Sequence, residues 1–265
     1  MTQPFTVLGS ILELHAARAH LGVSQGHNQG AETQWFDTSG SGNHGTLTSF
    51  AGTTSSGWAG TGTLADPHRL VFDGSSDFVA CPDLSACEDK TFTYEAWIVD
   101  STGTSGDSRV AISEWADADA PLAWLGLGTT GIPAFSMFGN AWSNQTEVNS
   151  NVAVNNGQPH HLVGTCDATT ARLYVDATEK GAPASATSVV LTGCVNTMVG
   201  KWATGWFPGG IMAARIYPFA LTPAQVAQNF AAGYLWPLDW NPGGPGVYTT
   251  GPYIKIGSFD IPVVA

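Results

Sequence analysis

The sequence predicts an all-β fold: a two-sheet antiparallel jelly-roll sandwich with one short C-terminal helix and an extended C-terminal tail. Short runs rich in Val, Ile, Phe, Tyr, Trp and Thr recur about every ten residues between turn-forming clusters, which is typical of sandwiches. One helical pattern stands out, close to residue 225. After it, Pro-Gly pairs alternate with small apolar clusters. We therefore place the sandwich in residues 1–235 and an extended arm in residues 236–265.

The clearest expected strand is FTYEAWIV, residues 92–99. Alternate residues of a strand point to opposite faces, and both faces of this one are largely apolar, so we expect it to be covered on both sides. The other expected strands are VLGSILEL (7–14), RLVFDG (69–74), DFVAC (77–81), SRVAISEW (108–115), APLAWLGL (120–127), PAFSMFG (133–139), HHLVGTCD (160–167), ARLYVD (171–176), SVVLTG (188–193), CVNTMVG (194–200) and GIMAARIYPF (210–219).

The expected helix lies in ALTPAQVAQNFAAG, residues 220–233. Thr222 and Gln225 form a Thr-x-x-Gln capping box, and a proline occupies the first helical position. Gly233 suits the residue that ends a helix. Val226 and Phe230, four residues apart, would hold one face of the helix against the sandwich.

Charge and composition exclude two classes of partner. The chain has 265 residues with Lys+Arg 9 against Asp+Glu 21, a formal net charge of -12, which repels nucleic acid and anionic lipid. The first residues show no basic region followed by an apolar run, and no stretch is long enough to span a bilayer, so we expect neither a signal peptide nor membrane insertion. Without export, the four cysteines are expected to be reduced, mostly buried thiols, with disulfide pairing left open.

Five segments of the chain occur in the order seen in one known family. They are WFDTSGSGNHGTL (35–47), LVFDGSSDFVACPD (70–83), FTYEAWI (92–98), HHLVGTCDATTARLYVDATEKG (160–181) and GGIMAARIYPFALTPAQVAQNFAAG (209–233). Together they resemble the laminin-G-like, concanavalin A-like jelly-roll family, as found in tailed-phage virion proteins, over about residues 8–235. The resemblance implies two curved antiparallel sheets in a module that binds glycans or proteins and seldom catalyses a reaction.

The resemblance places DTSGSGNHG in the loop between the first strands, where many relatives hold a calcium ion. In this chain the matching oxygen donors are Asp37, Asn43 and Gly45. Calcium usually needs more than one carboxylate, and this chain has Met212 and Ala213 where the late strand of those relatives carries two acids. We therefore expect no cofactor and a loop that hydrogen-bonds to itself, with calcium as the alternative.

No pair of carboxylates shows the spacing of a glycoside hydrolase, which needs two acids on one face. Glu95 stands between aromatic residues, so we expect a structural role for it, and we assign Glu114, Asp117 and Asp119 to a solvated turn. The adjacent His160 and His161 point to opposite faces of a strand and cannot share one metal ion there. We expect no catalytic residues and no enzyme.

Ten tryptophans are an excess for a chain with so few basic residues. Trp142, Trp202 and Trp206 lie among turn residues, where a rigid aromatic face can stack on a sugar ring while Asn144 satisfies hydroxyls. We predict a glycan or partner site at these four residues. Packing against the arm or a partner chain is the alternative.

In the C-terminal arm, the segments YIKIG and FDIPVVA carry the apolar residues Tyr253, Ile254, Ile256, Phe259 and Ile261. We predict that they pair with the sheet of a neighbouring chain, because main-chain pairing is the usual way an extended peptide gains affinity.

Three classes of function follow. The first is a non-enzymatic structural or adhesion protein of a phage virion, either a head decoration or a minor tail component, made in the host cytoplasm and present in many copies beside other virion chains. The alternative is a carbohydrate-binding module of a cell-surface or secreted, and therefore extracellular, protein, and a host-surface glycan fits both readings. The third is a glycoside hydrolase, which the missing carboxylate pair disfavours.

Overall fold

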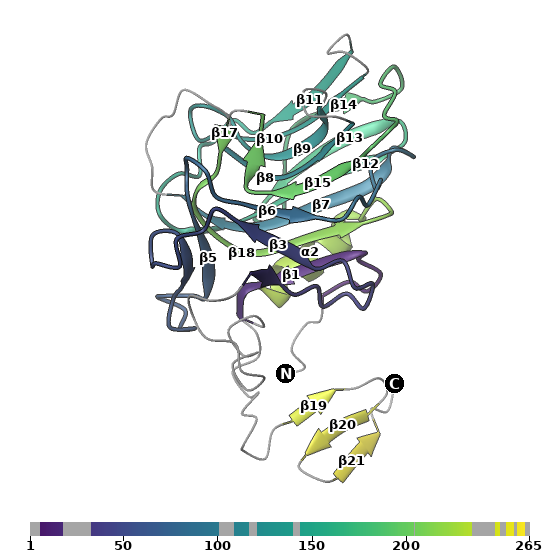
Figure 1. The fold of residues 1–265 in the computed structure, drawn as a ribbon. Helices are drawn as coiled ribbons and strands as arrows, with labels where there is room; N and C mark the ends of the chain where they lie inside the picture. The colour runs from purple at the N-terminus through teal and green to yellow at the C-terminus, as the bar shows by residue number, and fades with distance from the viewer. Residues whose placement is uncertain are drawn as a thin grey trace.

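The computed structural model describes residues 6–17, 33–100, 109–116, 121–139, 144–203, 205–234, 247–249, 253–256 and 259–262. Two antiparallel sheets lie face to face, with one short helix against the sandwich (Figure 1). This arrangement confirms the predicted fold class. Among the described residues, no helix has the length and hydropathy needed to cross a bilayer.

Sheet A has eight strands. Their order is β14 (Thr178–Ser185), β13 (Thr170–Val175), β12 (Pro159–Asp167), β7 (Thr91–Val99), β18 (Pro208–Tyr217), β5 (Arg69–Asp73) and β4 (Gly57–Ala59), with β1 (Leu12–His15) also paired to β18.

Sheet B also has eight strands. Their order is β11 (Gln145–Asn149), β10 (Pro133–Phe138), β9 (Pro121–Leu127), β8 (Arg109–Trp115), β15 (Asn196–Val199), β6 (Phe78–Cys81), β3 (Gly45–Thr48) and β2 (Gln34–Trp35). A separate hairpin joins β16 (Lys201–Trp202) to β17 (Gly205–Trp206).

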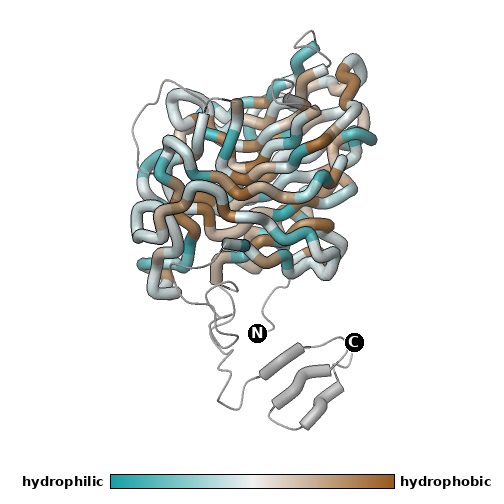
Figure 2. Tube along the Cα trace, viewed as in Figure 1, coloured by the Kyte–Doolittle hydropathy of each residue, from teal (hydrophilic) through white to brown (hydrophobic). Residues whose placement is uncertain are grey.

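The core fills the space between the two sheets, where hydrophobic residues follow the strands (Figure 2). Strand β7 is buried on both faces from Phe92 to Ile98, as its sequence predicts. Gly164 of β12 allows the two layers to pack closely, because a Cβ there would lie 2.3 Å from the ring of Phe135 in β10. Any side chain at this position would push the sheets apart.

One expected strand is wrong. The segment SVVLTG forms no strand, although its side chains alternate as a strand's would: Val189 and Leu191 are buried and Val190 is 53% exposed. Both edges of the neighbouring strand β15 are already paired, to β8 and to β6, so this segment finds no ladder partner there. Among the strands that the sequence does not predict are β2, β3, β4, the two hairpin strands β16 and β17, and the polar edge strands β11 and β14.

Helix α2 (Pro223–Ala232) has the predicted ends. Thr222 accepts from the backbone N–H of Gln225, whose side chain bonds back to the Thr222 backbone, and Gly233 ends the helix at φ 72°. Val226 and Phe230 both contact the sandwich, as predicted, and the buried face also includes a polar residue. Val226 is buried together with the polar Asn229, whereas Phe230 is 37% exposed and stacks on Trp97 at 5.5 Å between ring centroids.

The C-terminal arm contains the strands β19 (Val247–Thr249), β20 (Tyr253–Ile256) and β21 (Phe259–Pro262), paired as an antiparallel three-stranded sheet. The two segments expected to join a neighbour's sheet therefore pair with each other. Contact of Tyr253, Ile254, Ile256, Phe259 and Ile261 with another chain stays a prediction, as does the boundary at residue 235.

Candidate functional site

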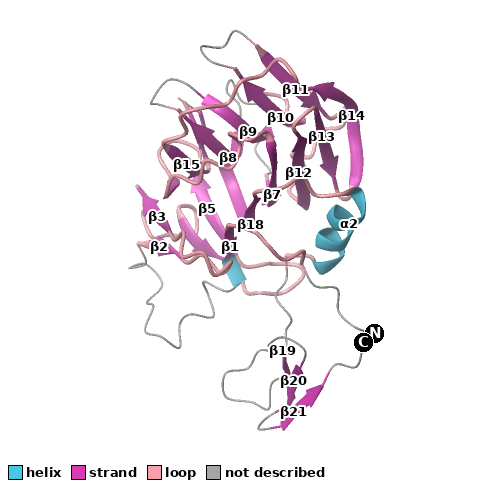
Figure 3. Ribbon diagram, turned by 90° about the vertical axis from the view of Figure 1, so that its right-hand side faces the viewer, coloured by secondary structure: helices cyan, strands magenta, loops and turns pink. Residues whose placement is uncertain are grey.

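The outer faces of the two sheets differ in what covers them. Helix α2 and the chain leading to it lie over the outer face of sheet A (Figure 3). A second small core forms beneath them; it contains Val163, Tyr174, Tyr217, Leu221 and Val226. In the part of the chain that the structure describes, no helix covers the outer face of sheet B.

An aromatic cluster, defined here as Trp115, Trp124, Phe138 and Trp202, packs on the outer face of sheet B. Trp202 joins the other three rings, with centroids 4.8 Å from Trp115, 5.7 Å from Trp124 and 5.4 Å from Phe138. These rings are 3 to 9% exposed, so the cluster forms a packed aromatic floor. It is the largest aromatic group on this face among the described residues.

The β16–β17 hairpin brings Trp202 to the cluster. Gly200, at φ 83°, turns the chain outward, and a Cβ there would lie 2.3 Å from the Phe72 ring. The hairpin is then anchored to β8, because Ser113 Oγ donates to the Lys201 carbonyl at 2.8 Å while accepting from Trp115 Nε1 at 2.8 Å. A fixed hairpin gives Trp202 a fixed position.

A polar ladder borders the aromatic cluster. We define it as Gln145, Glu147 and Asn149, the three exposed, outward-facing residues of β11. Its central carboxylate accepts from Ser136 Oγ at 2.5 Å, Gln145 Nε2 at 3.0 Å and Asn149 Nδ2 at 2.6 Å. The ladder is thus ordered by its own hydrogen bonds before any ligand arrives.

Strand register places the ladder directly beside the aromatic cluster. Glu147 is opposite Ser136, which is opposite Trp124 on the next strand. Gln145 is opposite Phe138, whose ring contacts Trp202. Exposed hydrogen-bonding groups beside a packed aromatic cluster are suited to a ligand rich in polar groups.

Two indole N–H groups in this region lack acceptors among the described residues, those of Trp124 and Trp206. A buried donor without an acceptor costs about 1–3 kcal/mol. The indole N–H groups also lack acceptors in three tryptophans elsewhere in the described chain, Trp35, Trp58 and Trp97. The feature that distinguishes the outer face of sheet B is therefore the polar ladder and not the indole groups.

The structure brings together part of the site expected from sequence. Asn144 directly precedes β11, and its backbone carbonyl accepts from the N–H of Gly139, which follows β10, at 2.9 Å. Trp206 is half-buried and pairs with Lys201 in the hairpin. Trp142 lies outside the described residues. Sequence reasoning missed Trp115, Trp124 and the ladder.

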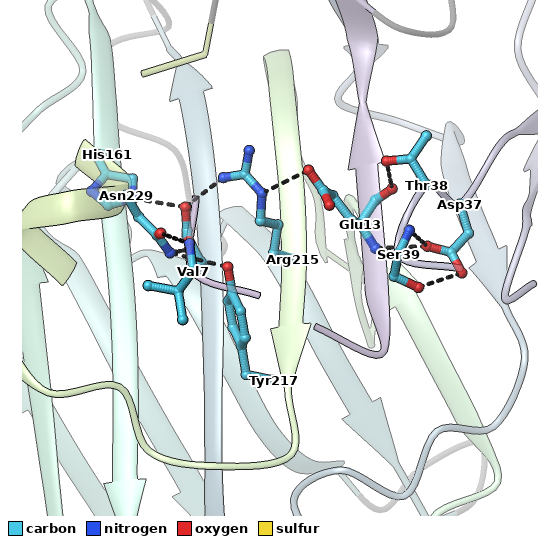
Figure 4. Close-up of polar contacts among 10 residues, drawn as sticks. Val7, Glu13, Asp37, Thr38, Ser39, His161, Arg215, Tyr217 and Asn229 are labelled. Atoms are coloured by element: carbon cyan, nitrogen blue, oxygen red, sulfur yellow. Dashed lines mark hydrogen bonds and ion pairs between the residues drawn. The ribbon is translucent and has the colours of Figure 1, made fainter. Parts of the chain in front are cut away.

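Glu95 serves the structure, as the sequence predicts. It is fully buried under α2 and accepts from Arg215 Nη1 at 2.6 Å, His161 Nε2 at 3.1 Å and Asn229 Nδ2 at 2.5 Å (Figure 4). Burial alone would raise the pKa of Glu95, but the Arg215 charge and these hydrogen bonds outweigh it and lower the pKa to about 2. A carboxyl held ionised in this way is a poor general acid.

Other acids and histidines also have structural partners. The prediction that Glu114 lies in a solvated turn is wrong. It is fully buried and faces the core from β8, where it accepts from Tyr94 Oη at 2.6 Å and from two backbone N–H groups. Asp117 and Asp119 lie outside the described residues. His160 bonds Asp176 while His161 bonds Glu95, so the adjacent histidines do diverge as predicted.

The Asp37 loop bonds to itself. Oδ1 of Asp37 accepts from the backbone N–H groups of Glu13 and Ser39, and Oδ2 accepts from Ser39 Oγ and the backbone N–H of Asn43 (Figure 4 shows the Glu13 and Ser39 contacts). Burial raises the pKa of Asp37, but these bonds lower it further than burial raises it. Gly45 is packed against Val79, 2.3 Å from where its Cβ would be.

These contacts bear on the calcium alternative. Both oxygens of Asp37 already accept from two donors each, and the Asn43 amide nitrogen donates to the Ile11 carbonyl at 2.7 Å. Among the described residues, no group of three or more His, Cys, Asp or Glu side chains is placed to hold a metal ion. A calcium ion on Asp37, Asn43 and Gly45 stays a prediction without a second carboxylate.

All four cysteines are free thiols, as expected for the reduced form. Cys87, Cys166 and Cys194 are buried, and burial raises the pKa of Cys166 to about 11. A thiol with a raised pKa is a poor nucleophile near neutral pH, so these residues serve packing.

Comparison with known proteins identifies the fold. A family model described as the Concanavalin A-like lectin/glucanases superfamily matches residues 73–227. Domain 4 of the extracellular GH43 arabinanase AbnA of Geobacillus stearothermophilus, in complex with arabinotriose, has a TM-score of 0.61 and 20% identity, over 84% of this chain and 98% of that one. A comparison with curated protein sequences finds no match.

Two larger proteins are also similar. The binding domain of botulinum neurotoxin DC in complex with SialylT has a TM-score of 0.58 and 11% identity, over 84% of this chain and 51% of that one. Trypanosoma rangeli sialidase in complex with the inhibitor DANA has a TM-score of 0.56 and 14% identity, over 83% of this chain and 32% of that one. The chain therefore spans about half of the toxin binding domain and a third of the sialidase, and these similarities establish the fold alone.

The Glu95 network predicts how stability depends on pH. Because the pKa of Glu95 is lower in the folded protein than its ordinary value of 4.5, the ionised carboxylate stabilises the fold above that value. This stabilisation is lost as the pH falls from about 5 to about 2. Urea unfolding across this range should show a shallower pH dependence for Glu95→Gln than for the wild type. The exposed Glu179→Gln should keep the wild-type slope; equal slopes for all three proteins would contradict the assignment.

The Asp37 loop predicts the effect of metal removal. Treatment with EDTA should leave the unfolding temperature unchanged, because protein donors already occupy the Asp37 carboxylate. Asp37→Ala should lower the free energy of unfolding by about 1–3 kcal/mol, since several buried donors lose their acceptor. A fall in the wild-type unfolding temperature with EDTA that calcium restores would show that the loop holds the ion.

Proposed function

The chain belongs to the Concanavalin A-like lectin/glucanases superfamily, and on this premise we propose that it is a non-catalytic carbohydrate-binding module whose site is the outer face of sheet B. The observation that carries the proposal is the polar ladder, ordered by its own hydrogen bonds, beside the aromatic cluster. Sugars combine an apolar C–H face with a rim of hydroxyls. The exposed amide and carboxylate groups of the ladder match the hydroxyls, and the packed aromatic cluster beside them supports the strands that carry the ladder.

A catalytic role is disfavoured by the positions of the acids. Hydrolysis of a glycosidic bond ordinarily needs two carboxyl groups facing each other across the substrate. Among the described residues, Glu95 and Glu114 are fully buried with structural partners, and Glu147 is the one acid within the strands of sheet B that faces outward. A single carboxylate can bind a sugar but cannot supply both the acid and the base.

The similar structures support a binding role. The arabinanase domain was solved with arabinotriose, and the toxin binding domain, of which this chain covers about half, was solved with SialylT. These relatives favour the carbohydrate-binding alternative over the virion role that the sequence analysis put first. A tailed-phage virion, its cytoplasmic assembly and its multicopy partner chains stay predictions, and a host-surface glycan is compatible with them.

The binding test compares matched substitutions on a glycan array. Gln145→Ala removes an amide of the ladder and should weaken binding about tenfold, the loss expected for one or two hydrogen bonds. Gln158→Ala, an exposed glutamine before β12, removes the same group away from the face and should leave binding unchanged. Trp202→Ala should weaken binding at least as much, with its unfolding temperature measured alongside.

Two results would count against the proposal. One is a wild-type protein that binds no glycan on the array. The other is glycan binding that Gln145→Ala and Trp202→Ala both leave intact, because the sugar would then occupy another part of the fold.

A further inference from the structure

Glu147 has an unusual set of neighbours for an exposed acid. It is held at the centre of the ladder by three neutral donors, from Ser136, Gln145 and Asn149, at 2.5 to 3.0 Å. No ion pair joins it to a basic residue in the described part of the chain. The carboxylate is therefore fixed in position without being neutralised.

The basic residues of sheet B and its hairpin have partners elsewhere. Arg109 is the one basic residue in the strands of sheet B; it is buried and paired with Asp100. Lys201, in the hairpin, places its ammonium over the Phe78 ring at 4.3 Å from the centroid. Phe78 is in β6, four strands along sheet B from β10 and five from β11 by strand order. A third basic residue, Lys180, lies on β14, which packs against β11, but it forms no ion pair with Glu147.

The ladder is rich in hydrogen-bond acceptors. An ionised carboxylate offers about four acceptor positions, and three are in use at Glu147. Gln145 and Asn149 each donate an N–H to Glu147, which leaves their carbonyl oxygens as acceptors without a donor among the described residues. Acceptors of this kind suit the hydroxyl donors of a sugar, whereas a carboxylate or sulfate group on the sugar would bring a second negative charge to Glu147.

From these observations, and resting on the proposed function, we infer that the site selects glycans by charge: it binds uncharged oligosaccharides and excludes anionic ones, with Glu147 as the residue that determines this specificity. The excess of acids over bases adds to the repulsion at longer range. Among the similar structures, the neutral arabinotriose represents the accepted class, and the sialic acid bound by Trypanosoma rangeli sialidase represents the excluded class. Specificity here comes from a repulsive group as well as from attractive contacts.

The experiment uses matched pairs of glycans, each a neutral oligosaccharide and its sialylated counterpart, with arabinotriose and trigalacturonic acid as a further pair. The wild type should bind the neutral member at least tenfold more tightly. Glu147→Gln, which keeps the shape of the side chain and removes the charge, should reduce that ratio to within about threefold. Glu179→Gln, the same change on the exposed edge of sheet A, should leave the ratio unchanged.

A second measurement needs no variant. Raising the salt concentration from about 0.1 M to about 1 M shortens the screening length from about 10 Å to about 3 Å, so the wild-type ratio should fall. Charge selection is wrong if the acidic members bind as tightly as the neutral ones or more tightly. It is also wrong if neither salt nor Glu147→Gln changes the ratio of neutral to acidic affinity. In both cases the carbohydrate-binding function stands. Failure of the wild type to bind any member overturns the function and the inference together.

Discussion

The buried carboxylate of Glu95 is the interaction on which the arrangement of the two faces depends. It joins β7 to β12 through His161, to β18 through Arg215 and to α2 through Asn229. A charge taken out of water is tolerable only with such a full set of partners, and removing one partner of a buried pair usually costs several kcal/mol. The network holds the helix over sheet A, where it covers the part of the outer face that contains Glu95 and Trp97.

Sheet B has the opposite design. Its outer face carries Trp115, Trp124 and Phe138 where sheet A carries an ion pair, and a six-residue hairpin rather than a helix lies over it. The hairpin position follows from one glycine at the exit of β15 and one serine on β8, because Gly200 permits the turn and Ser113 fixes the strand that follows. One face of the sandwich is thereby closed for stability, and the other keeps ordered polar groups at its border.

Local signals predicted much of the fold. The double-sided burial of β7 and both ends of α2 follow from alternation and capping chemistry, which act over a few residues. The contact of Trp202 with Trp124 could not be predicted, since it joins segments far apart in the chain through strand register. The burial of Asn229 was not predicted because a polar residue of a helix is normally exposed. Strand β11 was not predicted because its outward residues are all polar, although QTEVN alternates with the period of a strand.

The most direct test of the account is an NMR titration that follows the indole N–H resonances as a neutral oligosaccharide is added. If the outer face of sheet B is the binding site, the resonances of Trp124, Trp202 and Trp206 should shift and saturate together. Those of Trp35 and Trp97, which pack in the core and under α2, should stay in place. Saturable shifts confined to Trp35 or Trp97, with the sheet B tryptophans unchanged, would contradict it.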